Sequence, residues 1–312
     1  MPASSITPLA ISDGDLNPDR FASAIGESFA RFGFAIVSDH GIPRSVIDNA
    51  FDRTRRFFAL PEETKRKYFI AGGGGQRGYT PFGIETAKGA ARADLKEFWH
   101  VGRKLPVGHA LAKHMPPNLA VAEIPDFETV TYALFEEMDR LGLRILAAIA
   151  RYLELAPDYF NRCVSLGNSI LRLLHYPPVA PNAEGVRAGE HEDINVITLL
   201  LGAEESGLQL KDRDGRWLSI DPPPECVVVN IGDMLQRLTN HVLPSTTHRV
   251  TNPASERSGF SRYSMPFFQH FRPDFLIETL PSCMTPERPN RYPMPITTAD
   301  YLRERLAEIK LV

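Results

Sequence analysis

A histidine and an aspartate two residues apart are the side chains of this chain best suited to hold a metal ion. His191 and Asp193 stand at the start of the apolar run that ends at Leu201. In an extended strand, residues two apart point to one face, so we expect these two side chains to project together while Glu192 points away. An imidazole and a carboxylate on one face supply two ligands of the two-histidine, one-carboxylate triad that binds iron(II). The pattern alone is weak, because His-x-Asp also occurs at ordinary strand ends.

A third ligand has to come from a distant part of the chain, and His248 is the best candidate. It lies in the segment 245–250, at the start of a later short strand. His175 and His241 are candidates for groups that orient the ligands, against the alternative that they are satisfied core or surface residues. The histidines in a turn or ahead of the long helix fit less well: His40, His100, His109 and His114.

Arg262 and Ser264 form a second pair on one strand, 261–268. Both would face the inside of the β structure, where a guanidinium and a hydroxyl together bind a carboxylate. A buried arginine is costly without a partner, so an inward Arg262 predicts an anion in the cavity. The alternative is a solvent-facing arginine on an edge strand.

The elements that must position these residues differ between the two halves of the chain. Helical periodicity dominates the first half, with Asn17 and Pro18 as a helix start and expected helices at 45–58, 61–68 and 127–153 around a short strand at 33–38. Short β-branched runs dominate the second half, at 169–176, 194–201, 207–210, 216–220, 226–231, 247–251 and 261–268. Many short strands without intervening helices predict a sandwich, jelly roll or barrel.

Composition limits the function classes. The chain has 312 residues, 43% hydrophobic and 23% charged, with a net charge of −3 and scattered basic residues, which argues against a nucleic-acid partner. Three separated cysteines indicate neither a disulfide framework nor a zinc site. We see no signal peptide and no stretch long enough to cross a bilayer, so we expect a cytoplasmic protein that acts on a small molecule.

Further motifs surround the residues discussed so far. They are HEDINVITLL (191–200), GRWLSIDPPPECVVVNIGD (215–233), STTHRV (245–250) and RYSMPFF (262–268), with RFGFAIVSDHGIP (31–43), FFALPEETKRKY (57–68), RGYTPFGIE (77–85) and DLKEFWHVGR (94–103) in the first half. Together they resemble the isopenicillin N synthase-like branch of the 2-oxoglutarate/Fe(II)-dependent dioxygenase superfamily. The resemblance covers nearly the whole chain, from Ile6 to Leu306.

This resemblance implies an α+β fold with a double-stranded β-helix (jelly-roll) core, flanked by helices that come mainly from the N-terminal part. We therefore expect a single oxygenase domain over 1–312. Within it, a mainly helical region, 1–120, would pack on the core, and 165–270 would form the jelly-roll catalytic core.

The resemblance also implies roles for individual residues. His191, Asp193 and His248 match the iron ligands, and Arg262 and Ser264 match the pair that binds the far carboxylate of 2-oxoglutarate. Tyr176 matches another co-substrate contact, while Leu174 stands where many members have asparagine. Gln76, Thr80, Phe82 and Phe268 fall in segments that shape the substrate pocket. No catalytic residue is expected beyond the metal ligands.

The implied function is an iron(II) dioxygenase that uses 2-oxoglutarate and O2 to hydroxylate a small organic molecule, with release of succinate and CO2. Desaturation and ring closure are variants of the same chemistry. One alternative is an isopenicillin N synthase-like oxidase that does not use 2-oxoglutarate. Two others are a zinc hydrolase, since the ligand set also suits zinc, and a non-catalytic small-molecule sensor on the same fold. The sequence assigns neither the substrate nor the oligomeric state.

Overall fold

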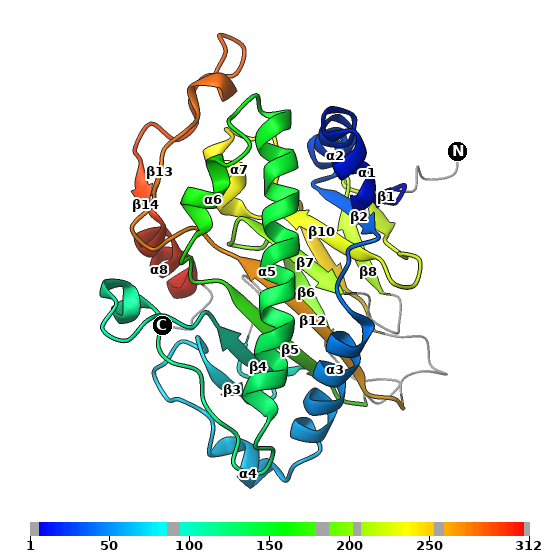
Figure 1. Cartoon of the computed structure of the whole chain (residues 1–312), viewed down its shortest axis with the longest axis vertical. Coiled ribbons are helices and arrows are strands. Elements are labelled where there is room, and N and C mark those ends of the chain that lie inside the picture. The colour runs from blue at the N-terminus through cyan, green and yellow to red at the C-terminus, as the bar shows by residue number, and fades with distance from the viewer. Residues whose placement is uncertain (1–5, 86–93, 179–186, 202–206, 253–258, 309–312) are drawn as a thin grey trace.

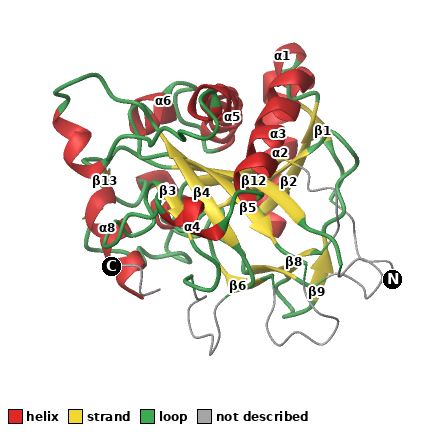
Figure 2. Ribbon diagram, turned by 90° about the horizontal axis from the view of Figure 1, so that it is seen from below, coloured by secondary structure: helices red, strands yellow, loops and turns green. Residues whose placement is uncertain are grey.

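Two β-sheets lie one under the other beneath a layer of helices (Figure 2). The computed structural model describes residues 6–85, 94–178, 187–201, 207–252 and 259–308. In spatial order, the eight-stranded sheet consists of β1 (Leu9–Ala10), β2 (Phe34–Ser38), β10 (Val227–Ile231), β7 (Ile197–Leu201), β12 (Arg262–Gln269), β5 (Ile170–Tyr176), β4 (Glu97–Gly102) and β3 (Gly78–Thr80). The four-stranded sheet consists of β6 (Ala188–His191), β11 (His248–Val250), β8 (Leu208–Lys211) and β9 (Trp217–Ser219).

Helices cover the outer face of the larger sheet (Figure 1). The described residues form the helices α1 (Ile11–Leu16), α2 (Pro18–Phe32), α3 (Arg44–Phe58), α4 (Glu62–Arg66), α5 (Phe127–Tyr152), α6 (Tyr159–Val164), α7 (Asp233–Leu238) and α8 (Thr298–Glu308), of which α5 packs on the central strands of this sheet. Short 3₁₀ segments span Ala110–His114 and Pro281–Cys283, and β13 (Leu276–Ile277) pairs with β14 (Ile296–Thr297). Among the described residues, no helix is both long enough and apolar enough to span a membrane.

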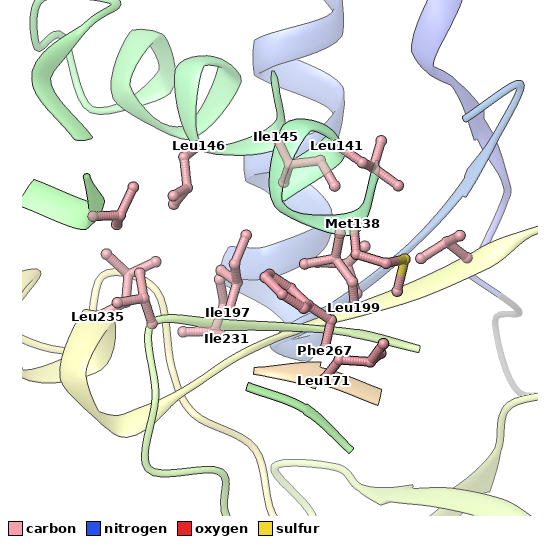
Figure 3. Close-up of a cluster of buried hydrophobic side chains, with 14 of the residues drawn as sticks. Met138, Leu141, Ile145, Leu146, Leu171, Ile197, Leu199, Ile231, Leu235 and Phe267 are labelled. Atoms are coloured by element: carbon pink, nitrogen blue, oxygen red, sulfur yellow. The ribbon is translucent and has the colours of Figure 1, made fainter. Parts of the chain in front are cut away.

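The core lies between α5 and the larger sheet (Figure 3). Met138, Leu141 and Ile145 share one side of α5, because they recur at intervals of three and four residues. They pack among buried side chains of the central strands, which include Leu199 and Phe267. This packing fixes the larger sheet from outside and leaves its other face for the functional site.

A tight turn between α2 and β2 brings the N-terminal part into contact with the segment that precedes β11 of the smaller sheet. Asn17 caps α2, since its side chain accepts a hydrogen bond from the backbone N–H of Arg20 at 3.1 Å. Gly33 ends the helix in the left-handed conformation, with φ of +69°. A Cβ at Gly33 would lie 2.1 Å from Oγ1 of Thr246 and 2.7 Å from the carbonyl oxygen of Pro244. Only glycine allows this close approach.

The arrangement confirms the predicted α+β fold with a jelly-roll core. The helices predicted at 45–58 and 127–153 correspond to α3 and α5, with ends within one residue. The region 1–120 carries the expected helices, and in addition it supplies β1 to β4 to the larger sheet. Sequence patterning missed β4 because its polar residues, Glu97 and His100, lie three apart and are both buried, so the strand shows no alternation of apolar and polar positions.

One expectation about local structure was wrong. We expected His191, Asp193 and the run to Leu201 to share one strand. Instead β6 ends at His191 and β7 begins at Ile197, and these two strands belong to different sheets. Asp193 therefore lies in the connection that crosses between the sheets, outside both strands, and a bend over 194–196 follows it.

Candidate active site

The three predicted metal ligands converge on one point between the two sheets. His191 at the end of β6 lies opposite His248 at the start of β11 in the antiparallel register. One ligand atom from each of His191, Asp193 and His248 lies within 4.8 Å of the others. Nε2 of His191 is 3.8 Å from Oδ1 of Asp193, and Nε2 of His248 is 3.9 Å from Oδ2. This spacing leaves room for one ion among the three donors.

Backbone carbonyls orient both imidazole rings. Nδ1 of His191 lies 2.7 Å from the carbonyl oxygen of Gly189, and Nδ1 of His248 lies 3.0 Å from that of Thr246. A carbonyl only accepts, so each Nδ1 carries the proton and each Nε2 keeps a lone pair for a metal. Burial and the neighbouring His248 lower the pKa of His191 to about 4, so this ligand is neutral at neutral pH.

Two side chains that the sequence analysis did not identify hold the carboxylate. Oδ2 of Asp193 accepts hydrogen bonds from Oγ1 of Thr198 at 2.5 Å and from Nδ2 of Asn230 at 2.8 Å. Burial alone would raise the pKa of Asp193, but the two histidines and these two donors outweigh it and lower the pKa. The carboxylate is therefore ionised and fixed in place before any metal binds.

The predicted anion-binding residues line a small inner cavity together with the triad. This cavity has a volume of about 70 Å³, and its lining includes Tyr176, Arg262 and Ser264 as well as His191, Asp193 and His248. Arg262 is 4% exposed, and its guanidinium carbon lies 5.1 Å from the centre of the Tyr176 ring. Arg262 faces Tyr176 across the β12–β5 pair, and Ser264 faces Leu174. The solvent-facing alternative for Arg262 is therefore wrong.

A second buried arginine accompanies Arg262. The side chain of Arg187 has no exposed surface, and its guanidinium carbon lies 5.8 Å from the Tyr176 ring centre. Sequence analysis did not identify Arg187, because it precedes the short strand β6 in a stretch without an apolar pattern. Arg187 and Arg262 thus place two guanidinium groups beside one tyrosine at this end of the site.

An outer cavity of about 460 Å³ adjoins the triad on the other side. His191 and Asp193 line it, and so do Gln76 and Phe268 of the predicted substrate pocket. Phe268 lines both cavities and lies between them. Thr80 is buried within β3 and Phe82 is exposed, and neither is among the described residues that line these two cavities. Helix α8 forms part of the outer wall through Leu302, Arg305 and Leu306.

The two histidines proposed as orienting groups make other contacts. Nδ1 of His175 lies 2.7 Å from Oε1 of Glu97, and its Nε2 lies 3.0 Å from Oγ of Ser261. Nε2 of His241 lies 2.6 Å from the hydroxyl of Tyr292. Neither contacts a ligand of the triad in these bonds, so both are satisfied structural histidines, which was the alternative reading.

The donor set fits an iron(II) ion and a chelating co-substrate. Two imidazoles and one carboxylate from one side leave the opposite positions of an octahedral ion open. Arg262 and Ser264 lie in the same cavity, where they can receive a carboxylate at a distance from the metal. The site thus defines the class of mononuclear non-haem iron oxygenases that use a dicarboxylate co-substrate.

Comparison with known families agrees with this assignment. Residues 2–123 match the N-terminal region of the non-haem dioxygenase in morphine synthesis, and residues 167–271 match the 2OG-Fe(II) oxygenase superfamily. The chain belongs to the 2-oxoglutarate/Fe(II)-dependent dioxygenase superfamily, in its isopenicillin N synthase-like branch, and it is an enzyme that uses iron(II), 2-oxoglutarate and O2.

Several relatives resemble the chain over nearly its full length. A 2OG-Fe(II) oxygenase family protein of Caulobacter crescentus is 54% identical, with a TM-score of 0.92 over 98% of this chain and 100% of that chain. T7H of Neurospora crassa in complex with alpha-KG (2-oxoglutarate) is 31% identical, with a TM-score of 0.86 over 97% of this chain and 95% of that chain, and it has also been solved with thymine. The oxidoreductase hxnY of Emericella nidulans is 32% identical over 91% of this chain and 83% of its own length.

Proposed function

We propose that the chain hydroxylates a small organic molecule, with the iron held by His191, Asp193 and His248. Arg262 and Ser264 would bind the far carboxylate of 2-oxoglutarate. The observation that carries this proposal is that Arg262 and Ser264 line the same inner cavity as the triad. Bound iron and 2-oxoglutarate supply the oxidising chemistry, in which O2 is consumed and succinate and CO2 are released.

The residues around the proposed metal site have different roles. Thr198 and Asn230 hold Asp193, while Tyr176 packs against the guanidinium that receives the co-substrate. Phe268 stands between the co-substrate and the outer cavity, where a substrate of modest size has room. Thymine, with which the Neurospora relative was solved, is a first compound to test.

We also propose that the whole chain forms one oxygenase domain with its catalytic core in 165–270. This is supported by the larger sheet, which combines strands from both halves of the sequence. We place the protein in the reducing cytoplasm, because Cys163, Cys226 and Cys283 are buried thiols without disulfides. We also propose that the protein does not bind nucleic acid.

The first experiment adds iron(II) and 2-oxoglutarate anaerobically to metal-free protein and records the weak visible charge-transfer band of the chelate. Wild-type protein should develop the band. His248→Ala should lose it because a ligand is gone, and Arg262→Leu should need a much higher 2-oxoglutarate concentration. Arg249→Leu is the matched control, since Arg249 packs on Trp217 at 3.9 Å and donates to Gln209 rather than lining the cavity.

The band and its controls separate the two ways in which iron could work here. A band that both site variants weaken, and that Arg249→Leu preserves, supports the assigned roles. Iron binding without any band would contradict them. That result would point to an oxidase that places its own substrate on the metal.

A further inference from the structure

An arginine lies in the wall shared by the inner and outer cavities. Arg172 lies between Leu171 and Leu173 in strand β5 and lines both cavities. Its guanidinium carbon is 4.2 Å from the ring centre of Phe98 and 5.1 Å from that of Phe268. All three side chains line the outer cavity, beside His191 and Asp193. A charged group thus lies over two aromatic rings next to the proposed metal.

Hydrogen bonds from Nε and Nη1 fix the orientation of Arg172, and its second amino group, Nη2, makes none of them. Nε of Arg172 donates to Nε2 of His100 at 2.6 Å, and Nη1 donates to Oε1 of Glu85 at 3.3 Å. His100 can accept because its Nδ1–H donates to the carbonyl of Gly75, and burial and Arg172 keep the pKa of His100 well below its usual value. Nη2 has no hydrogen-bond partner among the described residues. One donor therefore remains for a ligand.

A carboxylate oxygen beside Arg172 lacks a donor. Oε1 of Glu85 receives both Lys96, at 2.7 Å, and Arg172, whereas Oε2 is buried and accepts no hydrogen bond in the described part of the chain. A buried charged oxygen without a donor is costly, and a ligand N–H would remove that cost. The same wall thus carries a donor on Arg172 and, beside it, a carboxylate whose second oxygen accepts no hydrogen bond among the described residues.

Charge in the outer cavity disfavours an acid as the ligand. Its cations are Lys96, Arg172 and Arg305, and more than twice as many carboxylates line it, including Glu190, Glu192 and Asp233. Lys96 lies 2.7 and 2.8 Å from Glu85 and Asp94, which neutralise it. An anion entering this cavity would meet a net negative field. The acceptor that Arg172 receives should therefore be a neutral carbonyl.

We propose that the substrate is a neutral, planar cyclic amide or imide, with its carbonyl oxygen on Nη2 of Arg172 and its N–H directed to Glu85. Phe268 and Phe98 supply the apolar faces beside the ring. The pairing of one donor with one acceptor matches the N–H and C=O edge of such a ring. This inference rests on the proposed function, because it takes the outer cavity as the substrate site.

The test uses thymine as the probe, under anaerobic conditions with iron(II) and 2-oxoglutarate bound. Thymine should perturb the charge-transfer band of the wild-type complex with a measurable Kd. 1,3-Dimethylthymine keeps the ring and the methyl group but has no N–H, and benzoate is planar but anionic. Both should bind at least 10-fold more weakly than thymine.

Two variants assign the contacts. Arg172→Met should raise the Kd of thymine at least 10-fold, measured at a 2-oxoglutarate concentration that saturates the variant's own charge-transfer band, because Arg172 also lines the inner cavity. Glu85→Gln should weaken the discrimination between thymine and its dimethyl derivative. Arg144→Met is the control, because Arg144 pairs with Asp15 on the surface, and it should bind all three probes as the wild type does.

The outcomes separate the two proposals. A normal band that thymine does not perturb, equal or tighter binding of benzoate, or an unchanged Kd in Arg172→Met would each overturn the cyclic-amide assignment and leave the proposed function standing. Absence of the band in wild-type protein would instead overturn the proposed function, and this inference with it.

Discussion

Asn230 and Arg172 are polar residues with apolar neighbours on both sides in their strands, and each contacts a key part of the site. Asn230 follows three valines in β10 and donates to Asp193, and Arg172 follows Leu171 in β5. A polar side chain that interrupts an apolar run is a signal that sequence analysis can read, because its burial needs a partner. The partner itself is not readable, since Asn230 and Asp193 are 37 positions apart.

Replacing Asn230 should weaken iron binding without unfolding the protein. Asn230→Leu removes the 2.8 Å hydrogen bond to Oδ2 of Asp193, while Thr198 still holds the same oxygen. Loss of such a supporting group lowers metal affinity about 10- to 100-fold. Competition with a chelator of known iron(II) affinity measures the change.

A strand residue from the smaller sheet provides the control for this variant. Gln209→Leu removes an amide that pairs with Arg249 and not with the triad, so iron affinity should stay as in the wild type. Equal iron affinities in Asn230→Leu and Gln209→Leu would show that the bond to Asp193 has no role in binding the metal.

At the scale of elements, strands of both sheets carry most of the site, and Asp193 is supplied by the connection between β6 and β7. Sequence patterning located β5, β7, β10, β11 and β12, because each falls in a short apolar run between turn residues. It could not assign strands to sheets, since β6 and β7 are separated by only five residues yet lie in different sheets. Pairing across the jelly roll depends on contacts between distant segments, which local patterns do not record.

Gly33 tests the coupling between the α2–β2 turn and the metal site. Gly33→Ala should destabilise the fold by about 1–3 kcal/mol through its positive φ. It should also weaken iron binding, because the new Cβ pushes on Thr246, whose carbonyl orients His248. Urea unfolding and iron titration measure the two effects.

Gly41 separates backbone strain from the steric push. Its φ of +76° is similar, but a Cβ there meets nothing within 4 Å. Gly41→Ala should therefore lose stability while keeping its iron affinity. If Gly33→Ala binds iron as tightly as Gly41→Ala does, the turn does not position His248.

For the molecule as a whole, burial of neutral histidines sets the response to acid. Burial lowers the pKa of His270 to about 4, and His191 and His100 are shifted in the same direction. All three histidines line the outer cavity. Sequence analysis could not predict that they are buried. The unfolded chain binds protons at these positions near pH 6.5, whereas the folded chain stays neutral until about pH 4.

The free energy of unfolding of the metal-free protein should therefore fall as pH drops from about 6.5 to about 4. A shift of this size at His270 alone corresponds to about 3 kcal/mol across that window. Urea unfolding at several pH values measures the slope. His270→Gln should make the dependence shallower, and an unchanged slope would contradict the assignment of His270.

Strand β6 lies at the edge of the smaller sheet and pairs with β11 alone among the described strands. It also ends in His191, so a bound metal joins this edge strand to Asp193 and to His248 of its one neighbour. Metal occupancy should then govern how often β6 opens locally, and amide hydrogen exchange within Ala188–His191 would slow on iron loading far more than exchange in the central strands. The rate of amide exchange in this edge strand would therefore show whether the enzyme carries its iron.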